Sequence, residues 1–168
     1  MSDDKKHPVK KVNIICAKGN IEDIYASLVM GNGAVMEGIE TNLFFTFFGL
    51  EAIVKKWMKR PHTSIIGNPA MRMPVLGSRM PTWLGIIPGL EMLISWMMRK
   101  QMDDLDVPPI DEFMELITAG GGKIYACKLA MDMFKIKEED LSEHVSGVLT
   151  IGDFYEHSGG EGSQIIFT

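Results

Sequence analysis

Short apolar runs alternate with helical patterns along this chain, and the alternation limits the fold more than any other feature. The runs predict buried strands, because their apolar residues are nearly continuous. They cover residues 11–17, 40–47, 63–67, 123–126, 148–152 and 164–167. Strands that alternate with helices form right-handed βαβ units. We therefore predict an α/β fold with a mainly parallel sheet and helices on both of its faces.

Helical spacing fills the segments between these runs. The predicted helices cover residues 21–35, 49–59, 89–103, 109–119, 127–134 and 137–144, with one further turn at 154–158. Asn20 is a suitable N-cap for the first helix, and Asp23 can return a hydrogen bond in a capping box. Asp153, at a strand end, either orients a partner or caps the turn that follows, and we favour the cap.

One stretch places a thiol where a strand is followed directly by a helix. Gly120–Gly122 end the preceding helix, residues 123–126 form the strand, and Cys127 opens the helical spacing. Backbone N–H groups and the dipole at a helix start stabilise a thiolate, and Lys123 and Lys128 add positive charge. This favours a nucleophilic or sulfur-carrying cysteine. The alternative is that Cys127 only fills a small apolar gap at the strand end.

The carboxyl ends of parallel strands lie along one edge of the sheet, and ligands bind there. The residues predicted at this edge are Cys16, Phe47–Phe48, Gly67–Asn68, Cys127 and Gly152–Asp153. Both cysteines fall in this set, and the segment 69–88, rich in proline and methionine, begins beside it. A long segment without regular structure in a compact domain is usually functional or disordered, and its apolar content favours a functional loop.

The helix predicted at 89–103 is apolar over more than one stripe, so something beyond its own sheet must cover it. We prefer a partner subunit or protein as this cover. The loop 69–88 folding over the helix remains equally open.

Composition narrows the class of protein. The chain has 168 residues, 46% of them hydrophobic, which predicts one domain at 11–168 behind a polar tail at 1–10. Its net charge of −5 argues against a nucleic-acid partner. Two cysteines are too few for a disulfide scaffold and indicate a reducing compartment. We find no signal-peptide pattern and no apolar run of about 18 residues, so we expect a cytoplasmic protein without stable membrane insertion.

The motifs of cofactor chemistry are absent. No glycine-rich nucleotide loop follows the first strand, and there is neither a Walker lysine motif nor a C-x-x-C pair. The histidines show no metal-ligand spacing. We therefore expect neither a cofactor nor a metal.

The sequence resembles the DsrE/DsrF-like family over residues 12–168, and specifically its DsrE-like branch, which is sometimes labelled peroxiredoxin-like. The segments that carry the resemblance are 13–20, 40–49, 67–71, 122–127, 131–134, 152–155 and 164–168. The resemblance implies a three-layer α/β/α sandwich of about five strands, assembled into trimers or hexamers. It also implies sulfur trafficking inside the cell, with small TusA-like sulfur-carrier proteins as partners.

The family's sulfur-carrying cysteine corresponds to Cys127, and Cys16 matches an additional cysteine of the branch. Our first hypothesis is a sulfurtransferase or sulfur carrier that holds a persulfide or thiosulfonate on Cys127. Cys16 would resolve or stabilise the intermediate if the two Cα atoms lie within about 7 Å. Residues expected to bind substrate or partner are Gly19, Asn20, Asn68, Met71, Met73 and Lys128.

The second hypothesis is a non-catalytic module that binds a partner or an apolar ligand through the methionine-rich surface, with the cysteines as filler. A thiol peroxidase is disfavoured despite the label of the branch. Its chemistry needs a threonine and an arginine around the cysteine, and neither follows from the spacing.

Overall fold

The computed structural model describes residues 9–59 and 90–168. Its centre is a five-stranded sheet in the order β4-β3-β2-β1-β5, and the pairings between these strands are all parallel. The strands are β1 Lys11–Cys16, β2 Glu40–Phe45, β3 Lys123–Cys127, β4 Gly147–Leu149 and β5 Ser163–Phe167. The predicted α/β fold with a mainly parallel sheet of about five strands is confirmed.

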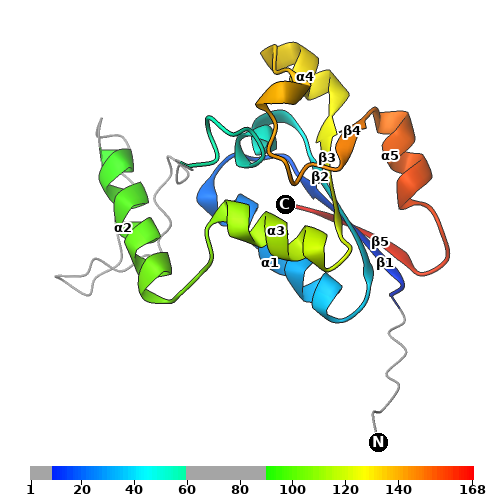
Figure 1. Ribbon diagram of the computed structural model, residues 1–168, viewed down its shortest axis with the longest axis horizontal. Helices are drawn as coiled ribbons and strands as arrows, with labels where there is room; N and C mark the ends of the chain where they lie inside the picture. Colours follow the sequence, from blue (N-terminus) through cyan, green and yellow to red (C-terminus); the bar gives the residue numbers. More distant parts are fainter. Residues whose placement is uncertain (1–8, 60–89) are drawn as a thin grey trace, which may run out of the picture.

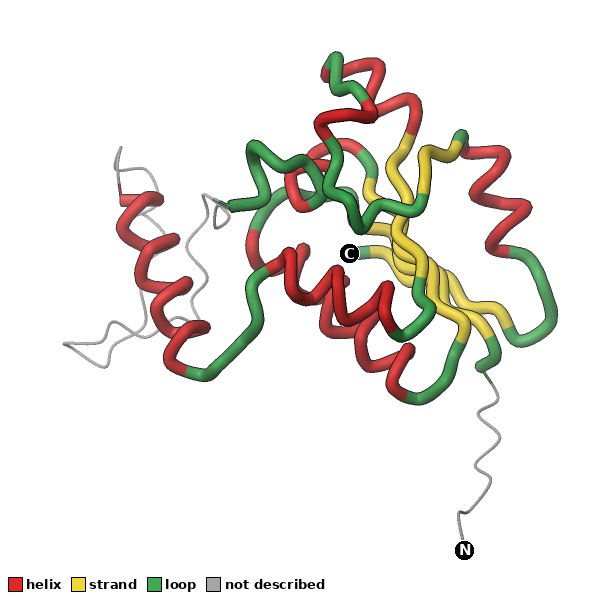
Figure 2. The backbone as a smooth tube through the Cα atoms, viewed as in Figure 1, coloured by secondary structure: helices red, strands yellow, loops and turns green. Residues whose placement is uncertain are grey.

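Helices cover both faces of the sheet, which makes three layers (Figure 1). Helices α1 (Ile21–Met36) and α3 (Ile110–Ala119) pack together on one face. Helix α5 (Ile151–Ser158) lies on the other face, while α4 (Lys128–Phe134) follows β3 directly. Helix α2 (Leu90–Asp104) stands apart from the sheet, as the tube in Figure 2 shows.

Adjacent residues of β2 contact the helices on opposite faces of the sheet. Leu43 packs against Gly31 of α1, where an added Cβ would lie 2.9 Å from a Leu43 methyl group. Phe44 points to the other face and stacks on Phe154 of α5 with ring centroids 4.6 Å apart. This alternation follows from the pleat of a strand. Because both faces are covered, the central strands are apolar on both sides, as the nearly continuous runs predicted.

Two predicted helices are replaced by 3₁₀ helices and turns. In place of the helix at 49–59, the 3₁₀ helix η1 (Phe47–Ala52) is followed by turns. Gly49 of η1 packs against the end of β1, where an added Cβ would lie 2.2 Å from the Cys16 carbonyl oxygen. In place of the helix predicted at 137–144, the structure has the short 3₁₀ helix η3 (Glu138–Asp140). The Lys137 N–H caps η3 by donating to the Asp140 carboxylate.

The caps also differ in part from the predictions. Asn20 occupies the N-cap of α1, but its side chain makes no cap hydrogen bond. Its amide N–H donates to the Glu22 carboxylate. Asp153 does not lie at a strand end as predicted, because β4 (Gly147–Leu149) ends earlier and Thr150 is the N-cap of α5. As the third residue of α5, Asp153 completes a capping box by accepting from the N–H and hydroxyl of Thr150. The strand at 63–67 and the loop at 69–88 lie outside the described residues.

Candidate functional site

The carboxyl ends of the three central strands meet at one edge of the sheet. Cys16 ends β1, Phe45 ends β2 and Cys127 ends β3. The register pairs Cys16 with Phe45, and Phe45 with Ala126. Cys127 therefore lies one residue beyond the level of Cys16, with β2 between them. Both cysteines lie at the predicted edge, where parallel α/β proteins bind ligands.

The two thiols nevertheless point to opposite faces of the sheet. Side chains alternate along a strand and paired residues of parallel neighbours share a face, so Cys16 and Ala126 face one way and Cys127 the other. Two strand spacings of about 4.8 Å place the Cα atoms about 10 Å apart, beyond the roughly 7 Å limit for a disulfide. Both cysteines are free thiols. In this arrangement the condition for Cys16 as a resolving cysteine is not met.

Cys127 lies beneath the short helix that it opens. It occupies the N-cap position of α4 with extended backbone, and only 2% of its surface is exposed. Residues at helical spacing from it, Met131 and Phe134, lie on the same side of α4. The Phe134 ring contacts the ring of Phe48 in η1, with centroids 5.7 Å apart. Cys127 is thus part of the buried core, and the helix that follows it contacts η1 through this pair of rings.

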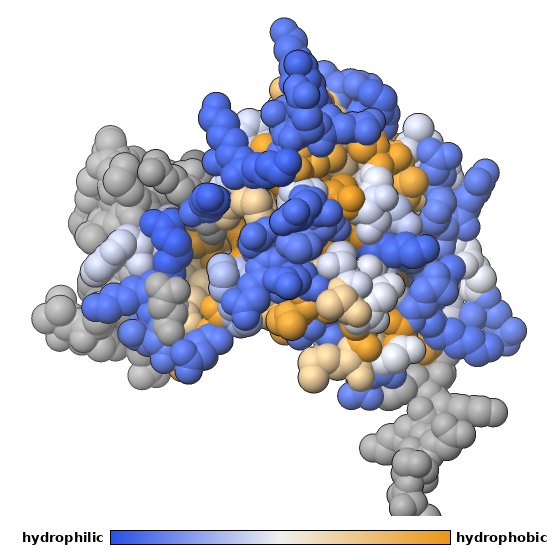
Figure 3. Space-filling view, in the orientation of Figure 1, coloured by the Kyte–Doolittle hydropathy of each residue, from blue (hydrophilic) through white to orange (hydrophobic). Residues whose placement is uncertain are grey.

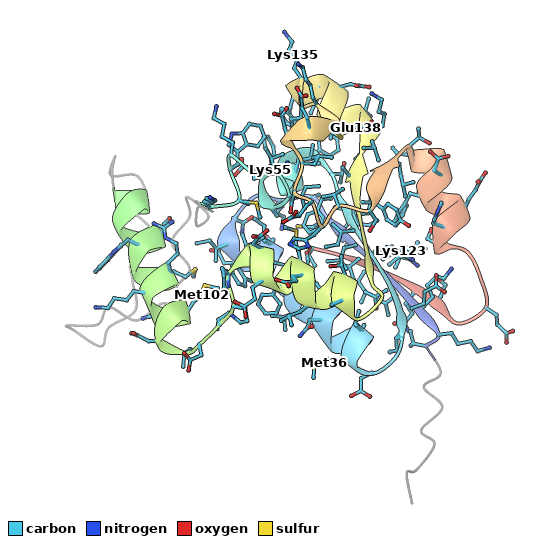
Figure 4. The ribbon with its side chains drawn as sticks, viewed as in Figure 1. Met36, Lys55, Met102, Lys123, Lys135 and Glu138 are labelled. Carbon is cyan, nitrogen blue, oxygen red and sulfur yellow. The ribbon has the colours of Figure 1, made fainter. Side chains whose placement is uncertain are left out.

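The two lysines expected near Cys127 differ in their placement. Lys128 follows it directly, but its ammonium pairs with the Asp132 carboxylate at 2.7 Å, and this hydrogen bond and charge raise the pKa of Lys128. Lys123 begins β3, at the opposite end of the strand from α4 (Figure 4). The prediction that Lys123 adds positive charge beside the Cys127 thiol is therefore wrong, because the whole length of β3 separates the two residues.

Cys16 is equally buried, at 1% exposure, but in a polar setting. Its thiol donates to the Lys18 carbonyl oxygen at 3.5 Å. The hydroxyls of Ser27 and Thr168 hydrogen-bond to each other at 2.6 Å beside it. Burial raises the pKa of the Cys16 thiol more than its hydrogen bonds with Ser27, Thr168 and the Lys18 backbone lower it, and the charge of Asp23 raises it further. The site favours a neutral thiol.

The other predicted binding residues divide into two groups. Gly19 packs under η1, where an added Cβ would lie 2.7 Å from the Phe48 carbonyl oxygen, and Asn20 begins α1 next to it. These two residues lie at the same edge as the cysteines. Asn68, Met71 and Met73 lie outside the described residues.

Sequence reasoning missed the residues that enclose the two thiols. Ser27 was hidden in the apolar stripe of α1, although a buried serine between Ile24 and Leu28 is a signal for a polar partner. Phe48 and Phe134 are far apart in sequence, so no local pattern pairs them.

Apolar side chains are exposed on η1 and α4, and we call them the edge patch: Phe47, Phe48, Leu129 and Met133. A hollow of about 130 Å³ opens between Phe47, Phe48, Trp57 and Phe134. Phe47 and Phe48 of the edge patch line this hollow.

Within residues 9–59 and 90–168, no group of three or more histidine, cysteine or carboxylate side chains is arranged to hold a metal ion. No helix in the same described ranges is long and apolar enough to span a bilayer.

Comparison with known proteins shows the family and the fold of this chain. The model of the DsrE/DsrF/DrsH-like family matches residues 8–162. The chain is 32% identical over 155 residues to the sulfur carrier protein DsrE2 of Allochromatium vinosum, covering 89% of this chain and 93% of that protein. It is 22% identical over 140 residues to the uncharacterized protein YrkE of Bacillus subtilis, covering 81% of this chain and 84% of YrkE.

Two solved structures share the fold. The YchN protein of E. coli superposes with a TM-score of 0.53 at 14% identity, covering 95% of this chain and all (100%) of that chain. The protein MTH1491 of Methanobacterium thermoautotrophicum, whose function is unknown, gives a TM-score of 0.51 at 10% identity, covering 94% of this chain and 99% of that chain.

Proposed function

Because this chain belongs to the DsrE/DsrF/DrsH-like family, we propose that it is a cytoplasmic sulfur carrier that holds sulfur on Cys127 and passes it between partner proteins. The observation that carries the proposal is the position of Cys127 at the end of β3 and the N-cap of α4, on the edge of the sheet that binds ligands. The sulfur carrier protein DsrE2 of Allochromatium vinosum aligns with 89% of this chain at 32% identity.

The chemistry is two successive thiol exchanges. The Cys127 thiolate attacks the outer sulfur of a donor persulfide, the donor's S–S bond breaks, and the donor leaves as a thiolate. With thiosulfate the same attack releases sulfite. An acceptor thiolate then attacks the outer sulfur of the Cys127 persulfide, and Cys127 leaves as a thiolate. Electrons and atoms balance without a further oxidant or reductant.

A buried thiol needs an opening step before it can react. Because only 2% of Cys127 is exposed, we propose that a donor reaches it when α4 and η1 separate. Helix α4 is short, and Leu129 and Met133 on its outer side are 60% and 53% exposed, so few contacts hold it closed. Separation of Phe134 from Phe48 is the opening that the geometry supports.

We propose a small TusA-like carrier as the exchange partner and the edge patch as its docking surface. The edge patch surrounds the opening described above, so a docked partner would both cover apolar surface and reach the thiol. Gly19, Asn20 and Lys128 border this surface and belong to the proposed contact.

We also propose that copies of the chain form a trimer or hexamer through the sheet. Ile165 and Phe167 of β5 are 53% and 67% exposed and in register with Asn13 and Ile15. Asn13 donates to the Ser158 carbonyl oxygen, so this is the face of α5. A parallel sheet is normally covered on both faces, and a second copy would supply the missing cover.

The alternative function is a binding module without sulfur chemistry, in which the cysteines only fill the core. The burial of both thiols, at 1% and 2% exposure, favours this alternative.

Intact mass measurement separates these functions. Reduced protein is incubated with a small-molecule persulfide, thiosulfate or tetrathionate. The wild type and Cys16→Ser should gain a sulfur or thiosulfate adduct that cyanide or excess thiol removes, and Cys127→Ser should gain none. Cys16→Ser is the matched control, since it removes the other buried thiol at the same edge. An adduct on Cys127→Ser at the wild-type rate contradicts the carrier role, and no adduct on any form supports the binding module.

A further inference from the structure

A groove separates α2 from the body of the protein. It has a volume of about 320 Å³, within the range of small-ligand sites, which runs from roughly 300 to 1,000 Å³. Its described lining residues are Tyr25, Met58, Lys59, Trp96, Arg99, Lys100, Met102, Val107, Pro109 and Ile110. Figure 3 shows apolar surface between α2 and α3, bordered by hydrophilic side chains. The sulfur chemistry proposed above does not use this groove.

The charge of the groove opposes that of the protein. Lys59, Arg99 and Lys100 line it, and no carboxylate is among its described lining residues. The whole chain carries a net charge of −5. A local cluster of cations against a negative background concentrates an anion at that place.

The remaining lining is apolar and aromatic. Trp96 is 55% exposed although it faces a hollow, and the Lys100 ammonium lies 5.6 Å from the centre of its ring. Met58, Met102 and Ile110 line the hollow with it. An exposed indole beside methionines gives an apolar ligand a large contact surface, since aromatic rings dominate burial energies.

The groove also lies at the functional edge. Ile110 is the first residue of α3, and Tyr25 lies in the first part of α1. Both helices run antiparallel to the strands, so they begin at the edge where the parallel strands end. Ligands of α/β sheets bind outside this edge.

We propose that this groove binds a small organic anion with an apolar body, such as an amphiphilic carboxylate or sulfonate. Its anionic group pairs with Lys59, Arg99 and Lys100, and its alkyl or aromatic part packs against Trp96 and the methionines. A small ligand fits better than an acidic protein surface. Asp104 and Asp106 are exposed next to the groove in the chain and repel an extended acidic surface.

The test is a titration of the full chain with dodecanoate below its micelle concentration, followed by tryptophan fluorescence and calorimetry. Wild type should bind dodecanoate saturably at one site, and Lys59→Gln/Lys100→Gln should weaken binding roughly tenfold, as expected for lost charge-assisted hydrogen bonds. The matched control Lys123→Gln/Lys135→Gln loses the same charge away from the groove and should bind within about twofold of wild type. Equal weakening in both double variants, or dodecanol binding as tightly as dodecanoate, overturns the proposal.

Vesicles distinguish the source of the anion. Sedimentation with phosphatidylglycerol vesicles but no saturable binding of monomeric dodecanoate means that the cations face a lipid surface, which overturns the small-ligand site. Sulfur loading of Cys127 is measured in the same double variant and should match wild type. Failure of dodecanoate binding therefore leaves the carrier proposal intact, and failure of sulfur loading leaves the groove intact.

Discussion

Cys16 and Cys127 end two strands of one sheet edge, are buried to the same extent, and have different surroundings. Cys16 faces hydroxyls and backbone groups, and its own carbonyl oxygen accepts the Thr46 N–H at 3.0 Å. Gly49 packs so closely on that carbonyl that no side chain fits between them. Segments on all sides therefore hold Cys16 in place.

In our proposal, Cys127 has a cover that opens more easily than the surroundings of Cys16. The cover is one short helix and one 3₁₀ turn, joined at their outer end by the contact of two aromatic rings. Equal burial therefore does not mean equal access, because the free energy of local opening differs between regions of a protein. This difference is why we propose Cys127, and not Cys16, as the thiol that exchanges sulfur with a partner.

The largest expected effect is on the free energy of unfolding, and it tests whether the surroundings of Cys16 are rigid. Gly49→Ala places a Cβ 2.2 Å from the Cys16 carbonyl oxygen, so the backbone must move and the free energy of unfolding should fall by about 3 kcal/mol or more. The matched control is Gly33→Ala, where nothing lies within 4 Å of the new Cβ. This helical position should gain about 0.5–1 kcal/mol. Urea unfolding measures both, and a neutral Gly49→Ala means that the Cys16 side is not rigid.

The next effect tests the cover of Cys127. Phe134→Ala removes the ring contact with Phe48, which contributes about 0.5–1.5 kcal/mol beyond burial, so opening should become roughly tenfold more frequent. The measurement is the alkylation rate of native protein in a Cys16→Ser background, where Cys127 is the one thiol left.

Leu129→Ala is the control for this prediction, because Leu129 lies on the same helix and is 60% exposed. Its alkylation rate should stay within about twofold of the parent. If the two variants react equally fast, the thiol reaches solvent by another route.

The smallest effect is the pH dependence due to Cys16. Burial raises the pKa of its thiol, so the folded protein keeps this proton at a pH where the unfolded chain releases it. The stability contributed is complete below the pKa of an ordinary thiol and is lost as the pH rises through the higher folded pKa. Between about pH 8 and pH 10, the free energy of unfolding should fall less steeply for Cys16→Ala than for wild type.

Tyr125, whose pKa is also raised, first by burial and then by the Glu40 charge, titrates in both proteins and cancels in the difference. Identical slopes for wild type and Cys16→Ala would show that the thiol is not desolvated as described.

Much of the fold follows from the sequence because it depends on local patterns. The continuous apolar runs predicted β1, β2 and β3 with both thiols at their ends. The cap of α5 was predicted at Asp153 and not at Thr150, because the strand before it was expected to continue to residue 152. Local spacing predicted an α-helix where the 3₁₀ helix η1 forms, and the packing of its Gly49 against the end of β1 joins segments far apart in sequence.

Of the candidate site, the sequence predicted only which residues lie at the strand ends. Its edge follows from parallel topology, but the opposite directions of Cys16 and Cys127 depend on the exact register of β1, β2 and β3. A shift of one residue would turn one thiol to the other face. The pairing of Phe48 with Phe134 and the hydroxyls around Cys16 arise from long-range packing, which no local spacing encodes.

The most direct test of the carrier role is to find which cysteine of the wild-type protein carries the sulfur. Protein loaded with a small-molecule persulfide is alkylated, digested and mapped by mass spectrometry. We expect the additional sulfur atom on the peptide that contains Cys127, with the Cys16 peptide carrying a plain alkylated thiol. Sulfur found on Cys16, with Cys127 unmodified, contradicts the account.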